Sequence, residues 1–464
     1  MCGIGAVIDK SENINNMLYE LLFNLQHRGQ DSSGMISYNS KTRKIHELKD
    51  FGLVDKHIKQ LENLLGNIGI GHVRYPTQGL ITKDEIQPFY IKDFDGISLA
   101  HNGNITNSVE LKQYLTQLNI SLISTSDSEI LLSLFIYFLK QKISNINELT
   151  NEKIFDVIQS IYNICRGSYS VIIMINTYGL IAFRDIYGIR PLVYSINNDY
   201  IAIASETIAF VDNNNYENIK NGEVIIITGM NINNKQIYNY PLIPCLFEYI
   251  YFARSESYVN DILVYEFREK IAEKLVLMFE RNNAYMEQID CVVPVPQTGL
   301  ISAISVAEKL KKPIKHAIIK NRYTHRTFIN PDKNTIVKNI KKIKIIKKLV
   351  QGKNLLVVDD SIVRGNTSKH ILNELRKCGA NKIFLASCCP PIRNPNIYGI
   401  AIPSYAELIA YNKTEKEIEQ ELGVDKLFYL DLNSLCQTLS ELNPNLRQFE
   451  TSVFDGKYIT DIVL

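Results

Sequence analysis

Short runs of apolar residues punctuate the first half of the chain. They are GIGAVI near the N-terminus, SVIIMI at 170–175, LIAF at 180–183 and EVIIIT at 223–228, with Gly, Asn and other polar residues between them. Short runs rich in Ile and Val are typical of buried β-strands. The pattern predicts a first half built on several strands.

Two helical patterns lie between these runs. Residues 14–25 carry Ile, Met and Leu at i, i+3 and i+4 spacing, which places them on one face of a helix. A second apolar stripe, 130–138, follows the polar start Ser-Asp-Ser at 126–128. Because such residues favour the first position of a helix, we expect an amphipathic helix from about that point.

The second half has a different rhythm. Wholly apolar runs at 291–295, 355–358 and 383–386 alternate with amphipathic segments such as 368–378, after which Gly379 is expected to end the helix. Apolar strands separated by helices indicate a parallel sheet covered on both faces. The change of rhythm falls in the polar stretch NINNKQIYNYPLIP, so we predict domains at 1–240 and 241–464, the second ending in a helical tail.

Composition and charge exclude several classes of protein. Lys and Arg number 51 against 49 Asp and Glu, so the net charge is only +2 in 464 residues. That balance argues against a chain that coats nucleic acid or a membrane, and the lysine-rich segment 338–348 is interpreted as a solvated face. No apolar run approaches the roughly 18 residues of a membrane span, and the start of the chain is unlike a secretory signal.

The eight cysteines are scattered and include no C-x-x-C pair. In a chain of this size they indicate reduced thiols and a cytoplasmic protein, and their spacing does not fit zinc or an iron–sulfur cluster.

One candidate site lies in the string NLLVVDDSIVRGNTSKHIL, residues 354–372. A buried strand ends in Asp359 and Asp360, and a loop of small residues then opens directly into a helix. Main-chain N–H groups at such a helix start bind phosphate, while the two carboxylates can accept hydrogen bonds from vicinal hydroxyls or face a divalent metal. A ribose 5-phosphate unit offers both groups. The loop lacks the GxxxxGK[ST] pattern of a nucleoside triphosphate site.

This string closely resembles the phosphoribosylpyrophosphate motif of the type I phosphoribosyltransferases. DCVVPVPQTG at 290–299 is similar to their pyrophosphate loop, with Gln297 in place of an acid, and KNRYTHRTFINP at 320–331 is similar to their mobile lid. The resemblance implies one Mg²⁺ per site. The residues it assigns to phosphoribosylpyrophosphate are Asp359, Asp360, Ser361, Arg364, Gly365, Asn366, Thr367, Ser368, Lys320 and Tyr323, and those it assigns to the metal are Thr298, Asp359 and Asp360.

A second candidate site begins at Cys2. Removal of Met1 would leave a cysteine whose α-amine, with a reference pKa of about 7.7–8.0, can act as the base for its own thiol. Arg74 in GHVRYPT can grip a carboxylate, and Asp127 in TSDSE can hold an ammonium group. Asn102 and Gly103 in HNGNITN supply donors for an oxyanion hole, so the set describes an enzyme that hydrolyses an amino-acid amide such as glutamine.

These strings, together with LQHRGQDSSG at 25–34, resemble the class II glutamine amidotransferases, whose N-terminal-nucleophile fold is a four-layer αββα sandwich. The resemblance implies that Cys2 is the nucleophile, that Asn102 and Gly103 form the oxyanion hole, and that Arg74, Thr77 and Asp127 bind glutamine. His27 and Arg28 are interpreted as scaffold. RDIYGIRPL at 184–192 and ASETIAF at 204–210 are interpreted as supports of the site.

The order of the two sites along one chain resembles the amidophosphoribosyltransferase family. That resemblance implies that ammonia from glutamine displaces pyrophosphate from phosphoribosylpyrophosphate, giving 5-phosphoribosylamine at the entry to purine synthesis. It also implies purine nucleotides as feedback inhibitors and a homotetramer or homodimer. Because only neutral ammonia is a nucleophile, we expect a shielded passage along the apolar join segment, residues 245–257, completed when the 320–331 lid closes. The join segment ends Arg-Ser-Glu-Ser, where the family has Arg-Pro-Asp-Ser.

Some members of that family carry a four-iron cluster or a propeptide. Cys245 matches one cluster ligand, but Asn396 stands at a second position and 450–453 holds no cysteine pair, so no iron–sulfur cluster is predicted. Cys2 directly after Met1 indicates that only Met removal is needed.

Three other functions stay open at this point. Another class II amidotransferase, making glucosamine phosphate, asparagine or glutamate, would need an ATP loop or domains that the second half lacks. A nucleotide-binding regulator with a phosphoribosyltransferase fold would have no need of the Cys2 site. An ammonia-only transferase would follow from retention of Met1.

Overall fold

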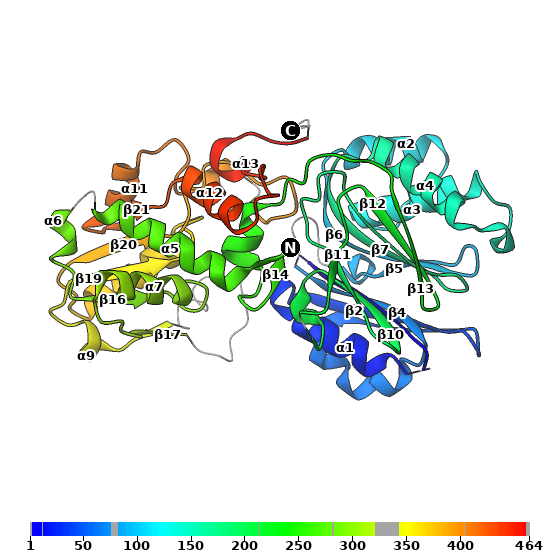
Figure 1. The fold of residues 1–464 in the computed structure, drawn as a ribbon, viewed down its shortest axis with the longest axis horizontal. Helices are drawn as coiled ribbons and strands as arrows, with labels where there is room; N and C mark the ends of the chain where they lie inside the picture. The colour runs from blue at the N-terminus through cyan, green and yellow to red at the C-terminus, as the bar shows by residue number, and fades with distance from the viewer. Residues whose placement is uncertain are drawn as a thin grey trace.

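The computed structural model describes residues 2–11, 13–75, 82–212, 214–280, 283–320, 343–402 and 404–460. Figure 1 shows two bodies side by side, with the first half of the chain on the right and the second half on the left. The N-terminus lies where the two bodies meet. None of the described helices is long and apolar enough to cross a bilayer.

Two antiparallel sheets form the middle of the first body. The first sheet has the order β11 (Glu217–Asn218), β9 (Val193–Ile196), β10 (Tyr200–Ala204), β1 (Gly3–Asp9), β4 (Ile68–Arg74), β2 (Ser32–Asn39) and β3 (Lys44–Phe51). The second has the order β13 (Asn231–Gln236), β12 (Glu223–Thr228), β8 (Gly179–Arg184), β7 (Gly167–Ile175), β6 (Ile97–Ile105) and β5 (Phe89–Ile91). All four predicted strands are present.

Helices cover the outer face of each sheet. α1 (Asn15–Asn24) and the 3₁₀ segment Val54–Asn63 lie on the first sheet, and α2 (Ser108–Gln117), α3 (Asp127–Lys140) and α4 (Asn151–Ile164) lie on the second. Strand alternation explains the layers: Ile4, Ala6 and Ile8 of β1 pack between the sheets, whereas Val7 packs under α1. The predicted αββα sandwich is confirmed.

A four-stranded parallel sheet forms the second body. Its order is β16 (Cys291–Pro294), β19 (Leu355–Asp359), β20 (Ile383–Ser387) and β21 (Lys426–Tyr429). α5 (Val264–Glu280), α7 (Leu300–Leu310) and α12 (Leu432–Leu442) cover one face, and α10 (Asn366–Lys377) and α11 (Glu415–Leu422) cover the other. Residues of β19 alternate between the two cores, as expected of a strand buried on both faces.

Smaller elements complete this body. Two antiparallel pairs are β14 (Tyr258–Val259) with β15 (Ile262–Leu263), and β17 (Ile318–Lys320) with β18 (Ile343–Ile345). The short helices are α6 (Asn283–Met286), α9 (Lys347–Val350) and α13 (Ser452–Asp455). β18 shows that part of the lysine-rich segment 338–348 is an edge strand, whose alternating Ile and Lys side chains suit a half-buried position.

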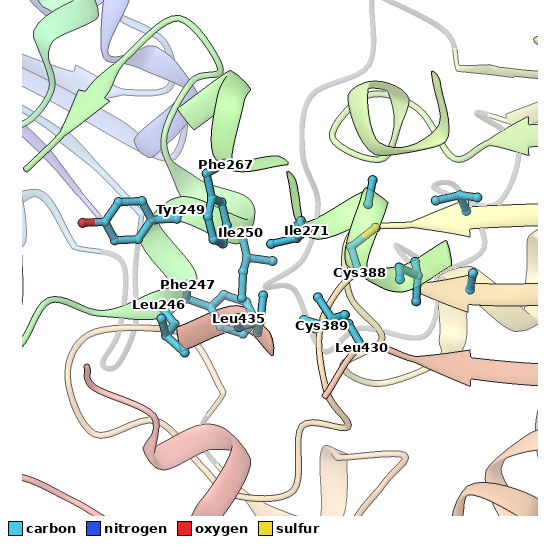
Figure 2. Close-up of a cluster of buried hydrophobic side chains, with 14 of the residues drawn as sticks. Leu246, Phe247, Tyr249, Ile250, Phe267, Ile271, Cys388, Cys389, Leu430 and Leu435 are labelled. Carbon is cyan, nitrogen blue, oxygen red and sulfur yellow. The ribbon is translucent and has the colours of Figure 1, made fainter. Parts of the chain in front are cut away.

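The join segment, 245–257, is part of the core of the second body. Leu246, Phe247, Tyr249 and Ile250 are at most 3% exposed, and Figure 2 shows them close to Phe267 of α5 and Leu435 of α12. Residues 248–252 form a π-helical turn. The segment is therefore held by packing as well as by its covalent connection to the first body.

Candidate active sites

Cys2 stands immediately before β1, at the junction of the two bodies. Its main-chain nitrogen donates to Oδ1 of Asn102 over 3.1 Å, and its Sγ lies 3.8 Å from the carbonyl oxygen of Tyr75. Asn102 is fully buried on β6, and within the described part of the chain its Nδ2 has no hydrogen-bond partner. A buried amide donor without a partner is costly unless a ligand satisfies it. The predicted nucleophile and the predicted oxyanion donor are thus neighbours.

Gly103 follows Asn102 on β6 with φ of +153°. A Cβ at this position would lie 2.0 Å from the carbonyl oxygen of Ser168 and 2.9 Å from Nε2 of His101. Only glycine lets the backbone take this path next to Asn102.

Arg74 is the last residue of β4 and is 8% exposed. Its Nη2 donates to Oε2 of Glu85 over 2.7 Å, and its Nη1 donates to the carbonyl oxygen of Glu85 over 3.0 Å. Thr77, the other residue assigned to glutamine beside Arg74, lies outside the described residues.

Asp127 begins α3, whose N-cap is Ser126, close to the predicted start. Its Oδ2 accepts a hydrogen bond from Ile105 N over 2.9 Å, and its Oδ1 lies 3.7 Å from Nδ1 of His101. Burial acts to raise the pKa of Asp127, but the nearby imidazole of His101 and the main-chain N–H groups of Ile105 and Ser128 outweigh it and lower the pKa. The carboxylate is therefore held ionised, as binding of an ammonium group requires.

Arg28 contacts the main chain of Cys2, the predicted nucleophile. Its Nε donates to the carbonyl oxygen of Cys2 over 3.0 Å, and its Nη2 donates to both carboxylate oxygens of Glu248, each over 2.9 Å. Nη1 of Arg28 pairs with Glu206, which also receives a hydrogen bond from His27 over 2.7 Å. The scaffold role predicted for His27 and Arg28 agrees with this geometry, because both bind carboxylates in the interior.

The second site lies where β19 ends. Asp359 and Asp360 are 8% and 7% exposed. Burial and the charge of Asp360 raise the pKa of Asp359 well above its usual range. Thr298, at the end of the loop after β16, donates to Oδ2 of Asp360, so two neighbouring strands bring the three predicted metal ligands together.

The loop after Asp360 leads into α10. Ser361 Oγ donates to Oδ1 of Asp360 over 2.5 Å, and Gly365 takes φ of +74° at the N-cap position. A Cβ on Gly365 would lie 2.4 Å from Cδ1 of Ile409. Asn366, Thr367 and Ser368 form the first turn of α10, so the loop of small residues does open directly into a helix, as predicted.

Three other residues assigned to phosphoribosylpyrophosphate, Arg364, Lys320 and Tyr323, are not part of that turn. Arg364 forms an ion pair with Glu407, and Lys320 ends β17 with an exposed side chain. Tyr323 and the rest of the predicted lid, 321–331, lie outside the described residues.

The two buried carboxylates fit a divalent cation. Mg²⁺ is usually held by one or two carboxylates together with substrate phosphates, so it does not need a complete protein cage. Among the described residues there is no group of three or more His, Cys, Asp or Glu side chains placed to hold a metal ion. The like charges at 359 and 360 repel each other, and a cation there would relieve that repulsion.

Comparison with known proteins gives a family match for each half of the chain. Residues 74–212 match the family model described as a glutamine amidotransferase domain, and residues 268–396 match the phosphoribosyl transferase domain. The fold and the two sites thus define a glutamine-dependent phosphoribosyltransferase.

Relatives of known function cover the full chain. Amidophosphoribosyltransferases of *Haemophilus influenzae* and *Escherichia coli* are each 40% identical over 99% of this chain and 93% of their own length. The enzyme of *Methanocaldococcus jannaschii* is 36% identical over 100% and 98%. The solved glutamine phosphoribosylpyrophosphate amidotransferase of *B. subtilis*, complexed with ADP and GMP, superimposes with a TM-score of 0.85 at 31% identity and covers 99% of this chain and 98% of its own.

The chain belongs to the amidophosphoribosyltransferase family. The reaction of that family uses glutamine as the nitrogen donor and phosphoribosylpyrophosphate as the acceptor, and it is the first step of purine synthesis. The alternatives left open by the sequence, another amidotransferase or a regulator with a phosphoribosyltransferase fold, do not agree with relatives that match along the entire chain.

Several residues around the sites were not predicted from the sequence. They are Glu85 beside Arg74, Glu248 beside Arg28, and Ser128, whose hydroxyl lies 3.1 Å from Nδ1 of His101. Glu206, which also pairs with Arg28, lies in ASETIAF, the string interpreted from the sequence as a support of the site. A charged residue in an otherwise apolar stretch, such as Glu248 in CLFEYIYF, is a local signal of a buried ion pair, but it does not name the partner.

Proposed function

We propose that glutamine is hydrolysed at Cys2. The Cys2 thiol attacks the side-chain amide carbon, its own α-amine takes the thiol proton and returns it to the leaving ammonia, and water then hydrolyses the thioester to glutamate. Asn102 Nδ2 and the Gly103 N–H stabilise the oxyanion. The observation that carries this proposal is the 3.1 Å contact between Cys2 N and Asn102 Oδ1, beside a buried Nδ2 that has no partner among the described residues.

The substrate glutamine is held at its amino-acid end. Arg74 and Thr77 bind the α-carboxylate side, and Asp127 binds the α-ammonium group. The lowered pKa of the half-buried Asp127 carboxylate supports this assignment.

In the second site, phosphoribosylpyrophosphate is the acceptor. Its 5-phosphate binds at the start of α10, to Ser361, Arg364, Gly365, Asn366, Thr367 and Ser368. The ribose hydroxyls face Asp359 and Asp360, and Lys320 and Tyr323 contact the pyrophosphate. Ammonia forms the new bond at C1 of the ribose as the bond to pyrophosphate breaks.

Mg²⁺ is the divalent cation we assign to this site, held by Asp359, Asp360 and Thr298. When bound, it would neutralise charge on the pyrophosphate leaving group. An iron–sulfur cluster does not fit the residues present. Oδ1 of Asn396 accepts hydrogen bonds from the N–H groups of Tyr398 and Ile400, each over 2.9 Å, and Glu450 binds the N–H of Ser452 over 2.8 Å. Positions that would supply cysteines therefore have structural roles in this chain.

Glutamine hydrolysis takes place in domain 1–240, and transfer to the phosphoribosyl group takes place in domain 241–464. Ammonia passes between them along the join segment, whose apolar side chains exclude water, and the 320–331 lid closes the passage. We also assign purine nucleotides as inhibitors, a homotetramer or homodimer as the assembly, and the cytoplasm as the compartment. The eight free cysteines support a reducing compartment, and the ADP and GMP bound to the *B. subtilis* enzyme support nucleotide regulation.

A two-product assay tests the proposal. Purified protein is given glutamine, Mg²⁺ and phosphoribosylpyrophosphate, and glutamate and pyrophosphate are measured beside a Cys2→Ser variant supplied with glutamine or ammonia. Wild type should release both products in step, and the variant should release pyrophosphate only with ammonia. Glutamate without pyrophosphate would contradict the second-site assignment, and glutamine-driven turnover by Cys2→Ser would contradict the first. Intact mass checks that Met1 is removed, and iron analysis checks for a cluster.

A further inference from the structure

Glu85 contacts Arg74 through two different groups. Its carboxylate accepts from Nη2 over 2.7 Å and its carbonyl oxygen accepts from Nη1 over 3.0 Å. Arginine has five N–H donors in a fixed plane, so two bonds to one residue fix the orientation of that plane. Three of the five N–H donors are left for a substrate carboxylate.

Burial makes this contact strong. Glu85 is 4% exposed and Arg74 is 8% exposed, so the ion pair has little competition from water. An unpaired buried charge is costly, which favours one defined position of the Arg74 side chain.

The same glutamate reaches the other end of the amino-acid site. Oε1 of Glu85 accepts from the main-chain N–H of Thr125 over 3.0 Å and from the hydroxyl of Thr125. Thr125 lies two residues before Asp127. Two residues beyond Glu85, Oε1 of Gln87 accepts from the N–H of His101 over 2.9 Å, next to Asn102.

We propose that Glu85 is the positioning residue that sets the spacing between Arg74 and Asp127, and thereby the selection of a substrate carrying both an α-carboxylate and an α-ammonium group. It touches neither reacting atom. This inference rests on the proposed roles of Arg74 and Asp127 in binding glutamine.

The direct test is Glu85→Gln, with steady-state kinetics for glutamine and for ammonia. Because the hydrogen bond to a charged group is replaced by a weaker one, we expect KM for glutamine to rise roughly tenfold or more, with kcat changed less. Ammonia-dependent pyrophosphate release should be unchanged, because ammonia has no α-carboxylate or α-ammonium group for Arg74 and Asp127 to bind.

A matched control is Glu129→Gln. Glu129 is a second buried glutamate that fixes the same turn, accepting from Ile123 N over 2.8 Å and from Ser124 N over 2.6 Å, but no contact between it and Arg74 is present. Its variant should leave KM for glutamine within about twofold of wild type. An equal rise in both variants would overturn the inference, because the effect would then come from the turn and not from Arg74.

A chemical readout separates positioning from general damage. Alkylation of Cys2 by iodoacetamide, which has no α-carboxylate or ammonium group, should proceed at the wild-type rate in Glu85→Gln. Inactivation by a diazo-ketone analogue of glutamine, which has both groups, should slow about tenfold. Equal slowing with both reagents would overturn the inference.

Arg74→Ala distinguishes failure of this inference from failure of the proposed function. If Arg74→Ala raises KM for glutamine and Glu85→Gln does not, Glu85 is not the positioning residue, while the glutamine site stands. If Arg74→Ala has no effect, both are wrong. In the double variant the two effects should not add, because they act through one guanidinium.

Discussion

Gly399 of the second body lies directly against Gly103 of the first. A Cβ on Gly399, whose φ is +96°, would be 2.8 Å from the carbonyl oxygen of Gly103 and 2.9 Å from its carbonyl carbon. Neighbouring contacts fix this approach: Asn104 Nδ2 donates to Ile397 O over 2.9 Å, and Ser168 Oγ donates to Tyr398 O over 2.8 Å. A loop of one body is thus seated on the proposed oxyanion hole of the other.

Substitution Gly399→Ala should therefore impair the glutamine reaction selectively. The added methyl group must displace the Gly103 backbone, and removal of one oxyanion donor typically costs about 10²–10³ in rate. We expect a loss of at least about tenfold in glutamine-dependent kcat, with ammonia-dependent activity retained. The control is Gly352→Ala, which has a similar positive φ of +71° but open space around its Cβ. Equal losses in both variants would show that backbone strain alone is responsible.

Glu248 holds two buried cations at the junction. It accepts from Arg28 and, over 3.2 Å, from Nη1 of Arg190. Glu248→Ala should lower the free energy of unfolding by about 3–5 kcal/mol, because both guanidinium groups lose a buried partner. Glu152→Ala, which removes an exposed ion pair with Lys235, should cost at most about 1 kcal/mol. Urea unfolding of both variants measures the difference, and similar costs would contradict the prediction.

The ion pairs of Glu206 make stability depend on pH. Burial would raise the pKa of Glu206, but His27 and Arg28 and the hydrogen bonds it accepts outweigh burial and lower it far below 4.5. A carboxylate whose pKa is lowered by folding stabilises the protein above its unfolded pKa and loses that contribution as pH falls further. The contribution of Glu206 should be nearly constant between pH 7 and about 5 and be lost progressively below about pH 4.5. The Glu206→Gln variant should be less stable than wild type at pH 7. Its free energy of unfolding, measured with urea, should fall less steeply as the pH is lowered below about 4.5.

Asp359 should show a conflict between stability and activity. Its pKa is raised by burial and by Asp360, so ionisation of this carboxyl group opposes folding of the substrate-free protein. Asp359→Asn should unfold at higher urea concentration, with a gain of about 1–2 kcal/mol, while pyrophosphate release falls by at least about 100-fold. Glutaminase activity without phosphoribosylpyrophosphate is the internal control and should be unchanged. A less stable variant would mean that the carboxylate is already compensated in the protein alone.

The sequence by itself predicted several of the elements and the residues proposed for both sites. The periodicity of apolar residues predicted α1, α3 and the apolar strands, because buried positions recur at a regular spacing along each element. The carboxylates after β19 and the small residues before α10 are neighbours in the sequence, so they could also be recognised there. Cys2, Asn102 and Asp127 could be assigned because each lies in a short string with a distinctive pattern.

Only the tertiary structure decided which charged groups meet. Arg28 and Glu248 are 220 residues apart, and the sequence around either residue does not indicate that the two are in contact. The same holds for Glu85 with Arg74 and Thr125, and for Gly399 with Gly103. The local sequence pattern indicates whether a side chain is buried. Which residue that side chain contacts depends on how the sheets, the helices and the two bodies pack together. Buried charges and close backbone contacts are set by that packing, so they appear only in the folded chain.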